Sequence, residues 1–266
     1  MSDQLLPSVE SIIKISKQLF KETVEITESS TIPDTTKIPI SNPKKWTRVE
    51  DVICIFVDMK GSTLLSASKH DKSTASAYQL YSGTAVKIFH EFNAPYIDVR
   101  GDGVLALFDS DKVHTALAAA VTFKTFANSS FKSLVSDKTD LDIGSHMGID
   151  MKTLLVKKIG LKSVGGRSDR NNEVWAGRPV NMASKLSSLS DDNELLISNR
   201  FFNKLKCDAA LKTCGCPDDE KFDLWKEKDL SDDDRFDFNK AYSLGSNWCT
   251  VHGREYCQIL LDFDNE

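Results

Sequence analysis

The sequence predicts an α+β sandwich in which helices cover one face of a mixed β-sheet. Three observations indicate this fold class. Residues 52–57 are a continuous apolar run that ends at Asp58, a pattern typical of a buried central strand. Beyond it, segments follow in the order strand, helix, strand, strand, helix, strand, strand, helix. Hydrophobic side chains make up 40% and charged side chains 27% of the 266 residues, which is the balance of a soluble globular protein.

The individual elements follow from local patterns. Apolar residues at helical spacing predict a helix within residues 7–27, and a stretch over 28–45 rich in Thr, Ser and Pro indicates a linker. Gly-Asp-Gly after Arg100 predicts a tight hairpin, and Asp109 or Asp111 is suited to cap the next helix. The remaining predicted elements are a helix over 73–92, strands over 95–99 and 104–108, a helix reaching residue 128, strands over 141–149 and 153–159, a loop over 165–169, a helix over 179–189 and a strand over 195–197.

Three regions are expected along the chain. Residues 1–50 form an N-terminal helix or arm and a linker, and residues 51–206 form the main domain. Residues 207–266 complete the same domain with a polar insertion and a closing strand over 255–261. The insertion is acidic, since residues 207–238 hold eleven acidic and five basic side chains.

Charge and composition exclude several classes of protein. The net charge of −5 argues against a general nucleic-acid binder, because phosphate contacts need a basic surface. No apolar run approaches the roughly 20 residues that cross a bilayer, so no membrane span is expected. The first residues lack the features of a signal peptide, and six cysteines in a chain of this length do not indicate a disulfide scaffold. We therefore expect a cytoplasmic protein.

Most of the cysteines lie near the C-terminus, together with His252. Cysteine and histidine are zinc ligands, but their spacing here contains no CxxC pair. We therefore expect reduced thiols without a metal, and a zinc site is the alternative. The residues concerned are Cys207, Cys214, Cys216, Cys249, Cys257 and His252.

Asp58 and Asp102 are the first candidates for chemistry. Asp58 ends a buried strand, where a carboxylate is costly unless it is paired or binds a cation. Asp102 lies at the tip of the predicted hairpin, so the two carboxylates converge if the strands are neighbours. Taken singly, Asp58 is explained as a helix cap at a strand end and Asp102 as a turn residue in a hairpin. Together, and with phosphates nearby, they suit Mg²⁺ or Mn²⁺.

Two further features suit a nucleotide. Residues 59–63, Met-Lys-Gly-Ser-Thr, form a turn at a predicted helix start, where backbone N–H groups bind phosphate oxygens. Asn181 and Lys185 lie four residues apart on a predicted helix and share one face. An amide and a cation in this arrangement could bind a ribose and a phosphate. Without other evidence, the pair is explained as part of an exposed polar helix face.

Four segments in register resemble the serial motifs of class III nucleotide cyclases. The match runs over residues 51–206 in the order and spacing of the family. The segments are Phe56-Val57-Asp58-Met59-Lys60-Gly61-Ser62-Thr63, Arg100-Gly101-Asp102-Gly103, Gly144-Ser145-His146-Met147-Gly148 and Val180-Asn181-Met182-Ala183-Ser184-Lys185.

The resemblance implies a ferredoxin-like cyclase sandwich with its active site at a homodimer interface. It implies that Asp58 and Asp102 bind two Mn²⁺ or Mg²⁺ ions on one protomer, while Asn181 and Lys185 reach in from the other. The implied reaction is attack of the ribose 3′-hydroxyl on the α-phosphate, which releases pyrophosphate and a 3′,5′-cyclic nucleotide. The implied substrate-binding positions in the turn are Met59, Gly61, Ser62 and Thr63.

The base-recognition positions depart from both purine patterns. Adenylyl cyclases of the family carry Lys, and guanylyl cyclases Glu, at the position of Asp98. The partner position falls on Val174, or on Glu173 after a shift of one residue. Asp98 accepts hydrogen bonds and Arg100, on the same strand face, donates them, which suits a pyrimidine edge. The alternative is that Asp98 and Arg100 form a salt bridge and recognise no base.

Within the family, the chain is most similar to the bacterial pyrimidine cyclases of antiphage (Pycsar) defence. This branch implies UTP, with CTP second, as the substrate, a cyclic pyrimidine nucleotide as a second messenger, and a separate effector protein that responds to it. Two alternatives stay open. One is an adenylyl or guanylyl cyclase with a divergent base pocket, and the other is an inactive cyclase-homology dimer that binds nucleotide.

Other positions match the family less closely. Most members carry Arg at the position of Lys185, and Lys keeps the charge but lacks the bidentate fork. Arg254 is the candidate for a basic phosphate-binding residue near the C-terminus. We expect His146 to be a packed core histidine and Trp175 to pack at an interface.

Overall fold

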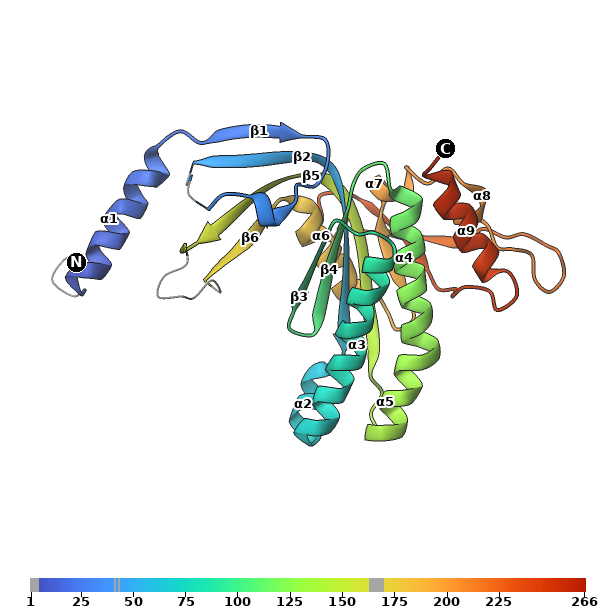
Figure 1. Cartoon of the computed structure of the whole chain (residues 1–266). Coiled ribbons are helices and arrows are strands. Elements are labelled where there is room, and N and C mark those ends of the chain that lie inside the picture. Colours follow the sequence, from blue (N-terminus) through green and yellow to red (C-terminus); the bar gives the residue numbers. More distant parts are fainter. Residues whose placement is uncertain (1–4, 41, 43, 163–169) are drawn as a thin grey trace.

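The computed structural model describes residues 5–40, 42, 44–162 and 170–266, and within them the chain forms one mixed sheet with helices on both faces (Figure 1). The strands are β1 (Glu25–Ser29), β2 (Lys45–Lys60), β3 (Tyr96–Arg100), β4 (Gly103–Phe108), β5 (Gly144–Gly160), β6 (Asn171–Ala176), β7 (Leu195–Ser198), β8 (Trp225–Asp229) and β9 (Lys240–Leu244). The α-helices are α1 (Pro7–Lys21), α2 (Ser62–Ser68), α3 (Asp71–Glu91), α4 (Val113–Phe126), α5 (Lys132–Thr139), α6 (Arg178–Leu189), α7 (Asn199–Phe202), α8 (Asp208–Leu211) and α9 (Gly253–Phe263).

The sheet has a main body and an extension. The main body has the strand order β3-β4-β2-β5-β7-β9-β8. The strands β2 and β5 are long, and their far halves carry β1 and β6, which form the extension together with α1 on the left of Figure 1. Residues 1–50 therefore join the sheet through β1 and the first part of β2, and residues 207–266 join it through β8 and β9.

Alternate residues of β2 face two different cores, as the two-residue period of a strand requires. Ile53, Ile55 and Val57 pack in the main core with residues of α3 and α4. Val52 and Cys54 pack on the opposite face, with a residue of α6. The expectation that helices cover one face is therefore wrong for α6.

The close approach of α6 to the sheet depends on Gly148 of β5. A Cβ atom at this position would lie 2.1 Å from the carbonyl oxygen of Ala183, a distance that no side chain tolerates. The glycine in the third sequence segment thus lets the fourth segment, on α6, lie directly on the strand.

Three local predictions are wrong. The strands expected over 141–149 and 153–159 are one continuous strand, β5, because it pairs with β2 along nearly its whole length. The closing strand expected over 255–261 is the helix α9, and β9 takes its place in the sheet. Neither Asp109 nor Asp111 caps α4, since the carboxylate of Asp109 accepts a hydrogen bond from the backbone N–H of Ile32 at 2.6 Å.

The cap of α4 comes instead from the far end of the chain. The carboxylate of Asp264 accepts the backbone N–H groups of His114 and Thr115, at 3.2 and 2.6 Å. On the same helix, the buried ammonium of Lys124 donates to the carbonyl oxygens of Gly245 and Ser246, at 2.7 and 3.0 Å. Polar side chains thus attach the C-terminal region to α4. The predicted loop over 165–169 lies outside the described residues.

Candidate active site

Asp58 and Asp102 come together at one end of the sheet. Asp58 lies near the end of β2, directly opposite Gly103 of β4, and Asp102 occupies the turn between β3 and β4. Burial raises the pKa of Asp58 above its ordinary value of 3.8, and the charge of Asp102 raises it further, while His146 has the opposite effect. The expected convergence of the two carboxylates is therefore present in a single chain.

This carboxylate pair fits a divalent cation. The charge of Asp102 disfavours the ionised form of half-buried Asp58, and a cation between the two carboxylates would remove that repulsion. Oxygen-only donors of this kind suit Mg²⁺ and Mn²⁺ rather than softer metals.

The turn after Asp58 presents backbone rather than side chains. Gly61 adopts φ +80° and precedes α2, whose first backbone hydrogen bond runs from Leu65 N–H to Gly61 C=O at 2.9 Å. The N–H groups of Ser62 and Thr63 precede that bond and point away from the helix, as expected for the start of a helix. The side chain of Met59 is buried in the main core, so that only its backbone is available to a substrate.

Two polar contacts that the sequence analysis missed lie next to Asp58. His146 is its register partner on β5, and the Nδ1 atom of His146 lies 2.7 Å from the carbonyl oxygen of Ser190, just after α6. Tyr81 of α3 hydrogen-bonds Ser145 at 2.6 Å in the core. His146 is half-buried and bonded, which agrees with a packing role, and its place opposite Asp58 follows from the strand register that the third segment carries.

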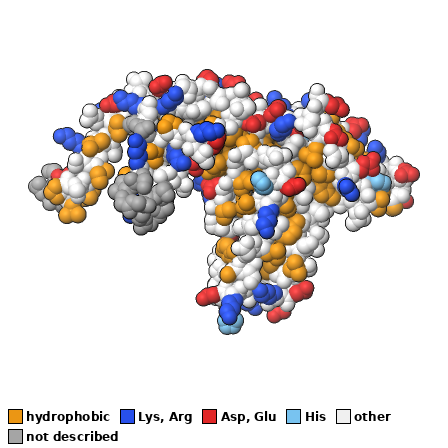
Figure 2. Space-filling view, in the orientation of Figure 1, with side chains coloured by type: hydrophobic (Ala, Val, Ile, Leu, Met, Phe, Trp, Pro, Cys, Tyr) orange, Lys and Arg blue, Asp and Glu red, His pale blue; other side chains and the backbone are white. Residues whose placement is uncertain are grey.

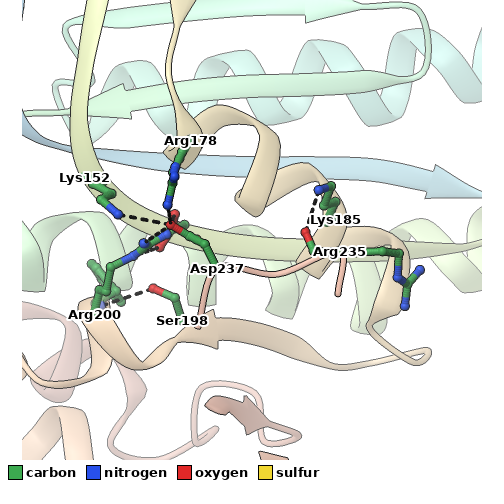
Figure 3. A network of polar contacts seen from close by, with 9 residues as sticks. Lys152, Arg178, Lys185, Ser198, Arg200, Arg235 and Asp237 are labelled. Atoms are coloured by element: carbon green, nitrogen blue, oxygen red, sulfur yellow. Dashed lines mark hydrogen bonds and ion pairs between the residues drawn. The ribbon is translucent and has the colours of Figure 1, made fainter. Parts of the chain in front are cut away.

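Asn181 and Lys185 lie on α6, away from the carboxylate pair. Asn181 is exposed, whereas the Lys185 ammonium donates to the backbone carbonyl of Arg235 at 2.6 Å (Figure 3). Lys185 therefore points toward the C-terminal segment, and Asp102 lies at the β3–β4 side of the sheet. No hydrogen bond or ion pair among the described residues joins the two pairs.

The segment whose carbonyl accepts the Lys185 hydrogen bond is also held by Asp237, two residues after Arg235. The carboxylate of Asp237 forms ion pairs with three basic side chains: Arg178 of α6 at 2.6 Å, Arg200 of α7 at 2.9 Å and Lys152 of β5 at 3.0 Å (Figure 3). Burial raises the pKa of Asp237, but the hydrogen bonds from these cations outweigh burial and hold the pKa well below its ordinary value. The acidic insertion is thus attached to the helix that carries Asn181 and Lys185.

Asp98 and Arg100 lie on one face of β3, as the alternation predicts, and they form an ion pair. The Nε atom of Arg100 lies 2.7 Å from Oδ2 of Asp98. This contact leaves Oδ1 of Asp98 and the terminal guanidinium nitrogens outside the pair, so the ion pair still offers an acceptor beside donors.

The predicted positions on β6 offer little to a nucleotide base. Val174 is an exposed position of β6 and has no polar group, and Glu173 is paired with Lys158 at 3.3 Å. Trp175 is buried within its own chain, where its ring lies 4.7 Å from that of Tyr96.

Arg254 is exposed on α9, which packs against α4 on the main-core face. Asp58 shares the β2 face of Val52 and Cys54, which pack on the α6 side. The structure does not bring Arg254 to the carboxylate pair.

Comparison with known proteins assigns the family. The chain is 36% identical over 241 residues to a uridylate cyclase of Micromonospora echinofusca, which covers 86% of this chain and 75% of that protein. It is 34% identical to a uridylate cyclase of Propioniciclava tarda, over 84% of this chain and 73% of that protein. The chain belongs to the uridylate cyclase family. No protein-family model matches the sequence.

Solved structures show that this uridylate cyclase family member has the class III cyclase fold. The adenylyl cyclase CyaB of P. aeruginosa superposes with a TM-score of 0.60 at 18% identity, over 76% of this chain and 96% of that one. The guanylyl cyclase Cya2 superposes with a TM-score of 0.57 at 17% identity, over 74% and 92%. The predicted α+β class is confirmed, except that helices cover both faces of the sheet rather than one. Among the described helices, none combines the length and apolar character that crossing a membrane requires.

Proposed function

We propose that the protein converts UTP into 3′,5′-cyclic UMP and pyrophosphate, with CTP as the second candidate substrate. The convergence of Asp58 and Asp102 in a chain of the uridylate cyclase family carries the proposal. The pyrimidine assignment draws on the names of the relatives and on the Asp98–Arg100 pair.

In this proposal the carboxylates of Asp58 and Asp102 hold two Mn²⁺ or Mg²⁺ ions. Such ions, when bound, activate the ribose 3′-hydroxyl and neutralise phosphate charge. The N–H groups of Ser62 and Thr63 bind phosphate oxygens at the start of α2. The new bond joins O3′ to the α-phosphorus, the bond from that phosphorus to the bridging oxygen breaks, pyrophosphate leaves, and the hydroxyl proton passes to solvent.

Asn181 and Lys185 act on the same substrate from a second chain. Asn181 orients the ribose, and the Lys185 ammonium stabilises the charge that develops at the α-phosphate. Lys185 must exchange its bond to the Arg235 carbonyl for the phosphate, or keep that bond and use its remaining protons, since an ammonium has three.

The proposed base site is the Asp98–Arg100 pair. The free Oδ1 of Asp98 accepts the N3–H of uracil, and the terminal guanidinium nitrogens of Arg100 donate to a uracil carbonyl. Cytosine presents an amino group to the same carboxylate, so the pair alone admits both pyrimidines. The choice of UTP comes from the relatives.

A homodimer is part of the proposal, and exposed apolar surface supports it. α1 buries no side chain, and Figure 2 shows hydrophobic side chains gathered along it. Leu6 is 70% and Phe20 is 91% exposed. A second copy of the chain would cover this surface.

We further propose that the cyclic nucleotide is a second messenger of antiphage defence that a separate effector protein reads. Similarity to the pyrimidine cyclases of that system supports this part. It is tested by finding a cyclic-UMP-dependent protein and by loss of phage resistance in an Asp58→Asn strain.

The experiment that tests the activity is incubation of the purified chain with Mn²⁺ and each of ATP, GTP, CTP and UTP, with products resolved by chromatography and mass. Cyclic UMP as the main product, absent with Asp58→Asn, is the expected result. A purine product would overturn the base assignment and keep the cyclase chemistry. If none of the four triphosphates yields a cyclic product while nucleotide still binds, the protein is a cyclase homologue without activity.

A further inference from the structure

Three thiols and an imidazole converge far from the carboxylate pair, where nothing in the cyclase chemistry uses them. The sulfur atoms of Cys214, Cys216 and Cys249 and a ring nitrogen of His252 all lie within 4.8 Å of one another. Two of these atoms, Sγ of Cys216 and Nδ1 of His252, are 3.1 Å apart. We name these four residues the cysteine–histidine cluster.

The cluster joins two segments that are distant in the sequence. Cys214 and Cys216 lie in the loop between α8 and β8, and Cys249 and His252 lie in the turn that leads into α9. Both segments belong to the end of the molecule that carries α8 and α9 (Figure 1). The arrangement is a C-x-C pair facing a C-x-x-H pair, and it contains no CxxC pair.

The geometry points to zinc: we propose that Cys214, Cys216, Cys249 and His252 bind one Zn²⁺ ion in a structural Cys₃His site. In a tetrahedral zinc site, bond lengths of about 2.3 Å to sulfur and about 2.0 Å to nitrogen separate the ligand atoms by roughly 3.5 to 3.8 Å. The cluster needs only small side-chain shifts to reach those separations. Thiolates and imidazole are soft ligands, which Mg²⁺ and Mn²⁺ do not prefer.

The surroundings of the cluster have the features of a built site. The backbone N–H of Val251 donates to Sγ of Cys249 at 3.4 Å, the type of contact that orients a metal-bound thiolate. The carbonyl of Cys249 accepts the N–H of Gly253 at 2.8 Å, which fixes the turn between Cys249 and His252. Four protein ligands leave no open position, so the ion has a structural rather than a catalytic role.

The ion would close a cavity that the fold leaves beneath these loops. A cavity of about 210 Å³ lies between α4, β8 and α9, and its lining includes Leu117, Val121 and Trp225 as well as the three cysteines. The cavity lies beneath the two segments that carry the ligands. A metal ion bound by both segments would link them directly above it.

The test starts with the full chain, purified under reducing conditions without added metal and dialysed against a weak chelator. Elemental analysis by mass spectrometry should give about one zinc per chain, as a four-ligand site predicts. The variants Cys249→Ser and His252→Gln should lose that zinc. Cys257→Ser is the matched control, because Cys257 is a half-buried thiol of α9 outside the cluster, and it should retain the zinc.

A second control separates this site from the proposed catalytic ions. The double variant Asp58→Asn, Asp102→Asn should keep its zinc in full, since it removes the carboxylate pair and leaves the cluster intact. Zinc that disappears with the carboxylates and persists in Cys249→Ser would overturn the proposal.

Wild-type measurements keep the test decisive if the cluster variants do not fold. Addition of a mercurial reagent should release zinc as the thiols react, and replacement by Co²⁺ should give the visible absorption of a tetrahedral thiolate site. An intact mass two hydrogens below the reduced value would show a disulfide instead and overturn the proposal. Iron in place of zinc, or reduced thiols that take up no Zn²⁺ when it is supplied, would also overturn it.

Discussion

The two halves of the candidate active site are supported in different ways. The carboxylate half, Asp58 and Asp102, is built on strand ends whose neighbours are buried apolar residues. The α6 half, Asn181 and Lys185, is on a helix that the C-terminal segment holds through charged contacts. The first half is positioned mainly by the central sheet, and the second half also contacts residues some fifty positions later in the chain. Changes near Asp237 should therefore affect one half and spare the other.

The largest effect is expected from the carboxylate half. Asp58→Asn should lower kcat by about 10³-fold or more, because in the proposed mechanism it removes a ligand of the ions that would provide several kcal/mol of transition-state stabilisation. Steady-state kinetics with UTP and Mn²⁺ measure this. Asp111→Asn, an exposed aspartate after β4, is the control and should keep full activity.

The same substitution should not weaken the fold. The pKa of Asp58 is raised in the folded chain, so the folded state binds more protons and loses stability as pH rises from 3.8 through that raised pKa. The neutral amide of Asn does not ionise, so it does not lose folding stability as the pH rises. The metal-free Asp58→Asn chain should melt at or above the wild-type temperature at pH 7, and a clear fall would show that Asp58 holds the fold together.

A smaller effect is expected from the α6 half. Lys185→Ala should lower kcat by about 10²-fold, the scale for the loss of one charge that acts in the transition state. Lys185→Arg should recover much of this loss because it restores the charge and adds a bidentate donor. Ser188→Ala, an exposed position of the same helix, is the matched control. Equal activity of Lys185→Ala and wild type would remove Lys185 from the site.

The smallest effect is expected from the contact that links α6 to the C-terminal segment. Asp237→Asn should cost about 1–3 kcal/mol of unfolding free energy at pH 7, because three charged hydrogen bonds lose their anion. It should also lower kcat several-fold through Lys185. Asp232→Asn, exposed in the same segment, is the control.

The pH dependence of this last effect has a defined sign. The folded pKa of Asp237 lies well below 3.8, so its stabilisation is present above 3.8 and is lost as pH falls through the folded pKa. Acid melting curves of wild type and Asp237→Asn should therefore converge below pH 4. A difference between the two chains that stays constant into strong acid would contradict the ion-pair assignment.

Much of the central sheet was predictable because local pattern and burial agree there. The apolar run before Asp58, the hairpin at Asp102 and the helix that carries Asn181 all form where the sequence indicates. The convergence of Asp58 and Asp102 followed from the expectation that their strands are neighbours. The resemblance added the family, which periodicity alone does not give.

The C-terminal region was less predictable because its contacts are polar and distant in sequence. The cap that Asp264 gives to α4, the bonds of Lys124 and the charges around Asp237 have no local pattern. The segment 255–261 is apolar enough for a strand, yet it becomes part of α9 because it packs on α4. The cysteine–histidine cluster has no CxxC spacing in the sequence, and its four residues meet only through the tertiary fold.

The measurement that most directly tests a site shared between two chains is complementation. Asp58→Asn and Lys185→Ala chains are each expected to be nearly inactive, and they fail in opposite halves of the site. When the two chains are mixed, half of the dimers contain one intact site, so activity should return to about a quarter of the wild-type value. Mixed dimers that form, as shown by two affinity tags, and stay inactive would contradict the shared site.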